Sequence, residues 1–316
     1  MRFFSRDINK TIDTNNILLL IILVAGIILR FWNYNNIQFM HDELSALSRL
    51  QFDSIGDVIK YGVMLGDTHP AGIQVFLYYW SSLFGTSEMA VKLPFIVSGI
   101  ISIWVSYKVG KLWFDETTGL LTAAMIASTQ FFVMYSQIAR PYVSGLVISL
   151  LMVYYWSLYF YKKRKILYLA LFVLFAALSA YNHHFSLLFA AIVGFSGLFL
   201  LKDKSNTIAY LTAGVFIFIL YLPHLGIFVS QLSQGGIGGE GGWLAKPKPT
   251  FIFEYVDYLL QFSIWGWLTL IGVVLFNIIT GKIVRYDKGL SNRMLLLSRF
   301  LLPIIIGYGY SVLRNP

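Results

Sequence analysis

The segment Tyr142–Phe160 reads YVSGLVISLLMVYYWSLYF and contains no charged residue. As an α-helix it is about 28 Å long, close to the roughly 30 Å of a bilayer's hydrocarbon core. Three other runs are almost wholly apolar: Ile17–Leu29, Met89–Tyr107 and Ala209–Leu222. Because only a helix satisfies its own backbone groups in hydrocarbon, these runs predict an all-α, polytopic integral membrane protein.

The composition points the same way. Hydrophobic residues make up 57% of the 316 residues and charged residues 12%, whereas a soluble domain carries about a quarter charged residues. The mean hydropathy is +0.69. We expect a single transmembrane domain over residues 1–316. The predicted spans are Ile17–Tyr34, Ala90–Trp113, Gly119–Ser136, Pro141–Tyr161, Ile166–Tyr181, His184–Leu201, Ile208–Phe228, Phe251–Ile279 and Leu295–Val312.

The apolar stretch at residues 71–85 is too short to cross. Its apolar part, Ala71–Phe84, covers roughly 21 Å as a helix, which favours an interfacial or re-entrant helix. Excluding it from the spans places most of the 24 lysines and arginines in the cytoplasm, as the positive-inside rule expects. Counting it as a span would put the cluster Lys162–Lys165 outside. The nine spans, with the N-terminus inside, are therefore the prediction.

The net charge of +9 then needs no nucleic-acid partner, because the basic residues form a cytoplasmic rim facing anionic lipid headgroups. The chain has no cysteine, which excludes disulfides, thiol nucleophiles and cysteine-bound metals. All five histidines fall on the predicted outer side. Chemistry is therefore expected at the outer face of the membrane.

The first extracytoplasmic loop, residues 35–70, is expected to hold two interfacial amphipathic helices. One follows Asp42 and Glu43, and the second begins at a Ser54–Asp57 capping box. Asp42 and Glu43 have two interpretations. They complement the dipole of a helix N-terminus, or they serve as a general base or metal-binding pair beside a lipid-borne substrate. A second outer loop, residues 229–250, is rich in glycine.

Three further sites on the predicted outer side carry candidate binding residues. His69 precedes Pro70 at the start of the interfacial helix, where an anion such as a lipid phosphate could bind, although His69 could equally satisfy a turn. Arg140 follows a predicted span, with Tyr142 nearby, and suits phosphate or carboxylate pairing. His183 and His184 are adjacent, so they point in different directions on a helix and make only a weak zinc motif.

The order and spacing of these motifs resemble the membrane-embedded GT-C glycosyltransferases. The resemblance is to the family 39 type in particular, which includes protein O-mannosyltransferases and the aminoarabinose transferase of lipid A. It runs from about residue 15 to 230. The motifs that carry it are Asp42-Glu43, His69-Pro70, Ser87–Pro94, Ser136–Tyr142 and Asn182–Phe185.

This resemblance implies a polyprenyl-phosphate-linked sugar as donor, transferred on the extracytoplasmic face to a lipid, glycan or protein acceptor. It implies catalytic carboxylates at Asp42 and Glu43, donor-phosphate binding by His69 and Arg140, and substrate binding by His183, Tyr142 and His184. Some relatives carry an acidic residue at the position of Arg140. A bound divalent metal ion is one further source of positive charge near the departing phosphate. A bacterial cytoplasmic (inner) membrane is the expected location.

Two other classes of function remain open from the sequence. A transporter or lipid flippase also carries polar residues among its spans, but usually near the middle of the bilayer. An inactive, C-terminally truncated subunit is the other alternative, since relatives usually carry more chain after the position of Pro316.

Overall fold

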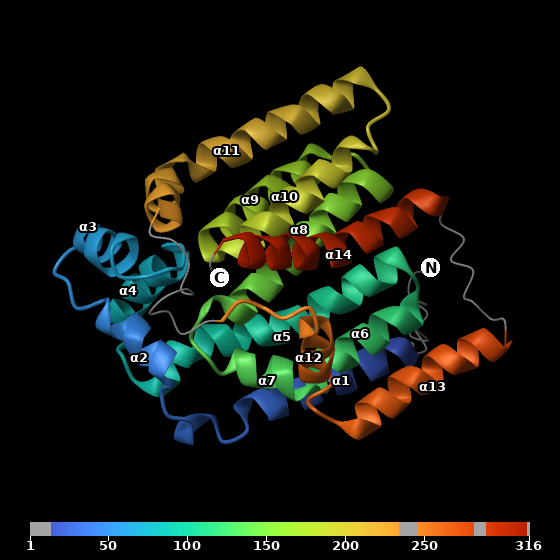
Figure 1. The fold of residues 1–316 in the computed structure, drawn as a ribbon, viewed down its shortest axis with the longest axis horizontal. Helices are drawn as coiled ribbons and strands as arrows, with labels where there is room; N and C mark the ends of the chain where they lie inside the picture. The colour runs from blue at the N-terminus through green and yellow to red at the C-terminus, as the bar shows by residue number, and fades with distance from the viewer. Residues whose placement is uncertain (1–13, 234–244, 281–288, 315–316) are drawn as a thin grey trace, which may run out of the picture.

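The computed structural model describes residues 14–233, 245–280 and 289–314. These residues form helices and connecting turns without any strand, which confirms the predicted all-α class (Figure 1). The elements are α1 (Thr14–Phe31), η1 (Tyr34–Asn36), α2 (His41–Ser48), α3 (Ile55–Asp57), η2 (Val58–Met64), α4 (Gly72–Phe84), α5 (Glu88–Trp113), α6 (Glu116–Ser128), α7 (Gln130–Ser136), α8 (Pro141–Tyr161), α9 (Ile166–Asn182), α10 (His184–Leu198), α11 (Lys204–Ser233), α12 (Phe251–Leu259), α13 (Ile264–Thr280) and α14 (Gly289–Leu313).

The nine predicted spans match these helices unevenly. Five of them, at α1, α5, α8, α11 and α14, are long and apolar enough to cross a membrane. Two more are bent helix pairs, α6 with α7 and α12 with α13, so the described chain has five to seven candidate spans by length. The remaining two predicted spans correspond to α9 and α10, of 17 and 15 residues. A polytopic membrane protein is confirmed, and the number nine stays a prediction.

The long helices alternate in direction, which sorts the charges to two ends. At one end, α5, α8 and α10 finish and α6, α9 and α11 begin. This basic end holds the ion pair of Lys111 with Glu116 and that of Arg164 with Asp203, at 2.7 Å. The opposite end holds His69, His183, His184 and His224. We call it the histidine end, and it lies on the left in Figure 1, where α2, α3 and α4 gather.

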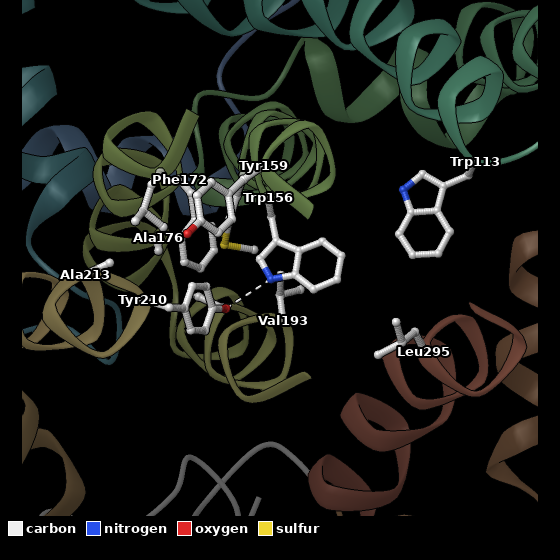
Figure 2. Close-up of a cluster of buried hydrophobic side chains, with 12 residues drawn as sticks. Trp113, Trp156, Tyr159, Phe172, Ala176, Val193, Tyr210, Ala213 and Leu295 are labelled. Carbon is white, nitrogen blue, oxygen red and sulfur yellow. Dashed lines mark hydrogen bonds between the residues drawn. The ribbon is translucent and has the colours of Figure 1, made fainter. Parts of the chain in front are cut away.

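An aromatic core joins the helices near the basic end. Trp156 from α8 is fully buried, and its indole Nε1 donates to the hydroxyl of Tyr210 from α11 at 3.1 Å (Figure 2). That hydroxyl donates in turn to the carbonyl of Gly194 in α10, at 2.7 Å. Trp113 of α5 stacks on Trp156 with ring centroids 6.4 Å apart. Since each polar tip is satisfied, these rings contribute their full apolar burial and tie four helices together.

A single arginine explains the break between α6 and α7. The two helices meet at 60°, and the break leaves the last carbonyls of α6 without helical partners. Arg30, at the end of α1, is fully buried and donates to the carbonyls of Ile126 at 2.8 Å and Ala127 at 3.1 Å. Its Nε donates to Ser136 Oγ in α7 at 3.1 Å. A cation here also complements the negative end of the α6 dipole.

Gly99 of α5 lies directly against the side chains of Arg30 and Ser136, and its lack of a side chain leaves room for them. A Cβ added at Gly99 would come within 2.2 Å of Ser136 Oγ and 2.8 Å of Arg30 Nε. We therefore expect Gly99→Ala to lower stability by about 1–3 kcal/mol, the usual cost of overpacking. Thermal unfolding of the detergent-solubilised protein measures this. The matched control is Gly214→Ala in α11, where nothing lies within 4 Å. Equal unfolding temperatures for the two variants would contradict the expectation.

The first loop forms helices where the sequence predicts them. Helix α2 contains Asp42 and Glu43, and Ser54 Oγ accepts from the backbone N–H of Asp57 at 3.1 Å to cap α3. Helix α4 has 13 residues and is not among the candidate spans. It packs against α5 and α9 at the histidine end. That these helices lie in the membrane interface stays a prediction.

The predicted continuous span Phe251–Ile279 is wrong in one respect. Helices α12 and α13 meet at 101°. Gln261 and Phe262 lie at the corner with φ of 59° and 54°, the left-handed region, so the chain turns sharply there. Of the predicted Gly-rich loop, residues 229–233 belong to the end of α11, and residues 234–244 lie outside the described residues.

Candidate functional site

A buried carboxylate organises the histidine end. Asp67, in the turn before α4, accepts from Arg49 Nη1 and from His69 Nδ1, both at 2.9 Å. Its Oδ1 also accepts from the backbone N–H groups of Thr68 at 2.7 Å and His69 at 3.2 Å. Burial alone would raise the pKa of Asp67. The hydrogen bond and charge of His69, with the charges of Arg49 and Arg140, outweigh burial and lower the pKa to about 2. Asp67 is therefore ionised throughout the physiological range.

His69 stands between opposite charges. Its Nδ1 lies 2.9 Å from Asp67 Oδ1 and 3.1 Å from Arg140 Nη2. One ring nitrogen cannot donate to the carboxylate and accept from the guanidinium at the same time. Since a carboxylate can only accept, an Nδ1–H directed to Asp67 leaves Arg140 Nη2 facing a donor.

Arg140 consequently has hydrogen-bonding capacity to spare. The residue is 5% exposed, and its buried Nε has no hydrogen-bond partner. An unpaired buried donor on a cation costs more than 1–3 kcal/mol, and an incoming anion would satisfy it. Around it, two arginines and His69 face the single carboxylate of Asp67, so the cluster carries an excess of positive charge.

The two adjacent histidines point apart, as the sequence predicts. His183 lies before α10, with its ring 5.3 Å from that of His69. Its Nδ1 accepts from the backbone N–H of Phe185 at 3.1 Å, so a neutral His183 carries its hydrogen on Nε2. His184 turns instead to Gln231 of α11, with Nε2 3.0 Å from Oε1. The structure thus joins His183, but not His184, to the side chain of His69.

Burial, together with the nearby charges of His69, His184 and Arg140, lowers the pKa of His183 to about 4. Below about pH 6.5, His183 is protonated in the unfolded chain but stays neutral in the folded protein until about pH 4. We expect the stability to fall as pH drops from about 6.5 towards 4. The matched variant is His183→Asn, which can still cap α10 but does not titrate. Its unfolding temperature should fall less over this pH range, and an identical pH profile would contradict the argument.

Glu43 lies in the first turn of α2, the position that the helix-terminus interpretation expects. Its side chain and that of Lys92 are both 0% exposed, with Oε2 3.4 Å from Nζ. Oε2 accepts from the backbone N–H of Met40 at 2.9 Å, and Oε1 accepts from that of Ala139 at 2.8 Å. Glu43 therefore joins α2 to the segment before Arg140. A carboxylate saturated in this way is better suited to holding structure than to accepting a proton from a substrate.

Asp42 points the other way. Its side chain is 61% exposed, and its charge is close enough to Tyr135 and Tyr142 to interact with both. The rings of Tyr135 and Tyr142 lie 4.8 Å apart, and Tyr142 also interacts with the Arg140 guanidinium. Asp42 and Arg140 thus both interact with Tyr142.

Two buried residues that the sequence analysis did not select hold this cluster together. Gln231 of α11 donates through Nε2 to the carbonyls of Asp67 at 3.0 Å and His69 at 2.8 Å. His224, also on α11, accepts through Nε2 from the backbone N–H of Ala71 at 2.9 Å. These three bonds join α11 to the segment that leads into α4. For Asp67 the only signal in the sequence is its position two residues before His69.

An apolar cavity of about 230 Å³ lies among α4, α5, α8 and α9. Two of its lining residues, Tyr181 and Asn182, directly precede His183 in the chain. Asn182 donates to the carbonyl of Pro141 at 2.8 Å and accepts from Ser144 Oγ at 2.7 Å, which fixes this corner beside Arg140. The apolar part of the lining includes Ile73, Phe76, Pro94, Phe95, Ile148 and Leu178.

The donor set does not fit a divalent metal ion. Across the described ranges, no three His, Asp or Glu side chains converge as a metal would require. The oxygens of Asp67 are already bonded to Arg49 and His69. Asp42 and Glu43 cannot chelate together, because one is exposed and the other is buried against Lys92.

Comparison with known families gives one match. The model of a family described as dolichyl-phosphate-mannose-protein mannosyltransferase matches residues 68–227, which is half of the chain. The matched segment includes His69, Arg140, Tyr142, His183 and His184 and leaves out residues 35–67 of the first loop, with Asp42. No curated protein matches the chain.

Proposed function

Because this chain belongs to the dolichyl-phosphate-mannose-protein mannosyltransferase family, we propose that it transfers a sugar from a polyprenyl-phosphate donor to an acceptor hydroxyl outside the membrane. The family makes the chain a membrane glycosyltransferase of the GT-C type. The donor, the side of the membrane and the role of each residue are our proposal.

The observation that carries the proposal is the unsatisfied guanidinium of Arg140. Arg140 is buried beside His69, and its Nε has no hydrogen-bond partner. Its Nη2 faces His69 Nδ1, which is hydrogen-bonded to Asp67. A phosphate oxygen would supply the missing acceptors. We assign Arg140 and His69 to the donor phosphate, and the Nε2–H of His183 to the same anion. As the sugar leaves, these groups would stabilise the charge that develops on the phosphate.

We assign the role of general base to Asp42. Its carboxylate is exposed and interacts with Tyr142, as Arg140 does, whereas Asp67 is held by Arg49 and His69. The acceptor hydroxyl would lose its proton to Asp42 while attacking the sugar from the side opposite the phosphate. One base and one departing phosphate suit a single displacement that inverts the anomeric carbon. The rings of Tyr135 and Tyr142 beside Asp42 suit contact with a sugar face.

The neighbouring apolar cavity supports a lipid-linked donor over a nucleotide sugar. It is lined from four helices and adjoins the residue before His183. A prenyl chain whose phosphate lies at Arg140 would place its first isoprene units near this cavity. A nucleotide is polar and soluble, so an apolar cavity beside the phosphate site would not contribute to binding it.

Membranes containing the protein test the donor. They should consume radiolabelled polyprenyl-phosphate sugar and leave a nucleotide sugar unused. A transporter or flippase would move the labelled lipid across the bilayer without releasing polyprenyl phosphate. Movement without such release would reject the proposed activity.

A second experiment tests the orientation. The chain has no cysteine, so Asp42→Cys and Lys163→Cys each create a unique thiol, at the histidine end and the basic end. In intact cells an impermeant maleimide should label the first and spare the second, as the positive-inside rule expects. The reverse pattern would place the site in the cytoplasm.

A further inference from the structure

Arg30 is a fully buried cation near the site, and it has no role in the proposed chemistry. It is 0% exposed, and its bonds go to the carbonyls of Gly26, Ile126 and Ala127 and to Ser136 Oγ. None of its hydrogen bonds in the described part of the chain goes to a carboxylate. Burying a cation among neutral acceptors costs free energy, so its retention calls for a reason.

We propose that Arg30 is a positioning residue for Arg140, an inference that rests on the proposed donor-binding role of Arg140. The connection runs through α7. Arg30 bonds the broken end of α6 on one side and Ser136 on the other, and Arg140 follows Ser136 by four residues. The guanidinium thus sets both the 60° bend and the exit of α7 towards His69.

The chemistry of the bend favours arginine over other residues. The carbonyls of Ile126 and Ala127 come from consecutive residues at a helix end, and Ser136 Oγ lies on the far side of the break. A planar fork with five N–H groups reaches all three at once. A lysine carries three donors on one atom, so it cannot span them. Without the fork, two carbonyls would be left unpaired at membrane depth.

The other side of the same segment is already fixed. Glu43 Oε1 accepts from the backbone N–H of Ala139, one residue before Arg140. Gln137 Nε2 donates to the backbone carbonyl of Arg30 at 3.0 Å, a bond that survives any change of the Arg30 side chain. Loss of the Arg30 guanidinium should therefore let Ser136 and α7 shift while Ala139 stays anchored. The expected result is a rotated Arg140 in a folded protein.

A double-mutant cycle with Arg140 tests the inference. In wild-type background, Arg30→Gln should raise the KM for the polyprenyl-phosphate donor about tenfold per folded molecule, with a smaller change in kcat. In an Arg140→Met background the same change should raise it less than twofold, because there is no longer a guanidinium to position. Arg30→Lys should fall between wild type and Arg30→Gln. Equal effects in both backgrounds would overturn the inference.

The control is Arg299→Gln, since Arg299 is a second buried arginine, at the basic end, with its Nη2 bonded to Ser196 Oγ at 3.2 Å. It should lower the unfolding temperature without coupling to Arg140. If Arg30→Gln fails to fold, Ser136→Ala removes one bond of the same set and should show the same coupling on a smaller scale. An Arg140→Met variant with unchanged donor KM would reject the proposed function itself. If Arg140→Met raises the donor KM but the effects of Arg30→Gln and Arg140→Met are additive, only the positioning role of Arg30 is rejected.

Discussion

Asp42→Asn should lower kcat for sugar transfer by about 100- to 10,000-fold, the range expected when a general base is removed. Asparagine keeps the size and shape of the side chain but cannot accept the proton of the acceptor hydroxyl. The Asp42 carboxylate is 61% exposed, so the exchange leaves no buried group unpaired. The unfolding temperature should therefore change little. Single-turnover release of polyprenyl phosphate from labelled donor measures the effect on chemistry.

Two neighbours serve as controls for that result. Asp53→Asn changes another exposed carboxylate of the same loop and should leave turnover unchanged. Glu43→Gln should act mainly on stability, because it leaves the buried Lys92 without its charge partner. If Asp42→Asn turns over donor as fast as wild type, Asp42 is not the base.

Arg140→Met should lower kcat/KM for the lipid-phosphate donor by about 30- to 1,000-fold. This corresponds to roughly 2–4 kcal/mol, within the range lost when one partner of a buried charge pair is truncated. Methionine fills similar space but offers no donor to the phosphate. Arg140→Lys should recover part of the activity, since lysine restores the charge without the two-pronged geometry. Initial rates against donor concentration give the measurement.

Arg164→Met is the matched control, because Arg164 is an arginine at the basic end, ion-paired to Asp203. It should leave donor KM unchanged. An Arg140→Met enzyme with a normal donor KM would show that the phosphate binds elsewhere.

The membrane class and the sorting of charges to two ends could be predicted from the sequence. Apolar runs such as Tyr142–Phe160 leave little choice of structure in hydrocarbon. The spacing between them fixed which residues share an end, and the structure brings His69 and His183 into ring contact. These features depend on residues close together in sequence or on the alternating direction of successive spans along the chain.

The bends could not be predicted in this way. No proline or glycine marks the break at Thr129, and the side chain that bonds the exposed carbonyls there is Arg30, separated from Ile126 by 96 positions in sequence. The corner between α12 and α13 is made by Gln261 and Phe262, neither of which signals a left-handed turn. Distant partners decide both the geometry of α7 and the length of continuous helix.

The different roles of the adjacent residues Asp42 and Glu43 could not be predicted from the sequence either. Asp42 and Glu43 differ by one position, yet one side chain is exposed and the other fully buried. Successive residues on a helix point about 100° apart, and only the place of Lys92 in α5 decides which of the two is covered. Gln231 was missed for the same reason, since its bonds to the turn before α4 span more than 160 positions.

Equilibrium binding of a prenyl monophosphate and of the matching prenyl alcohol tests the central claim most directly. The account predicts that the wild-type protein binds the phosphate more tightly than the alcohol, and that Arg140→Met binds the two alike. Equal affinity of the wild-type protein for both ligands, or a phosphate preference that survives Arg140→Met, would contradict it.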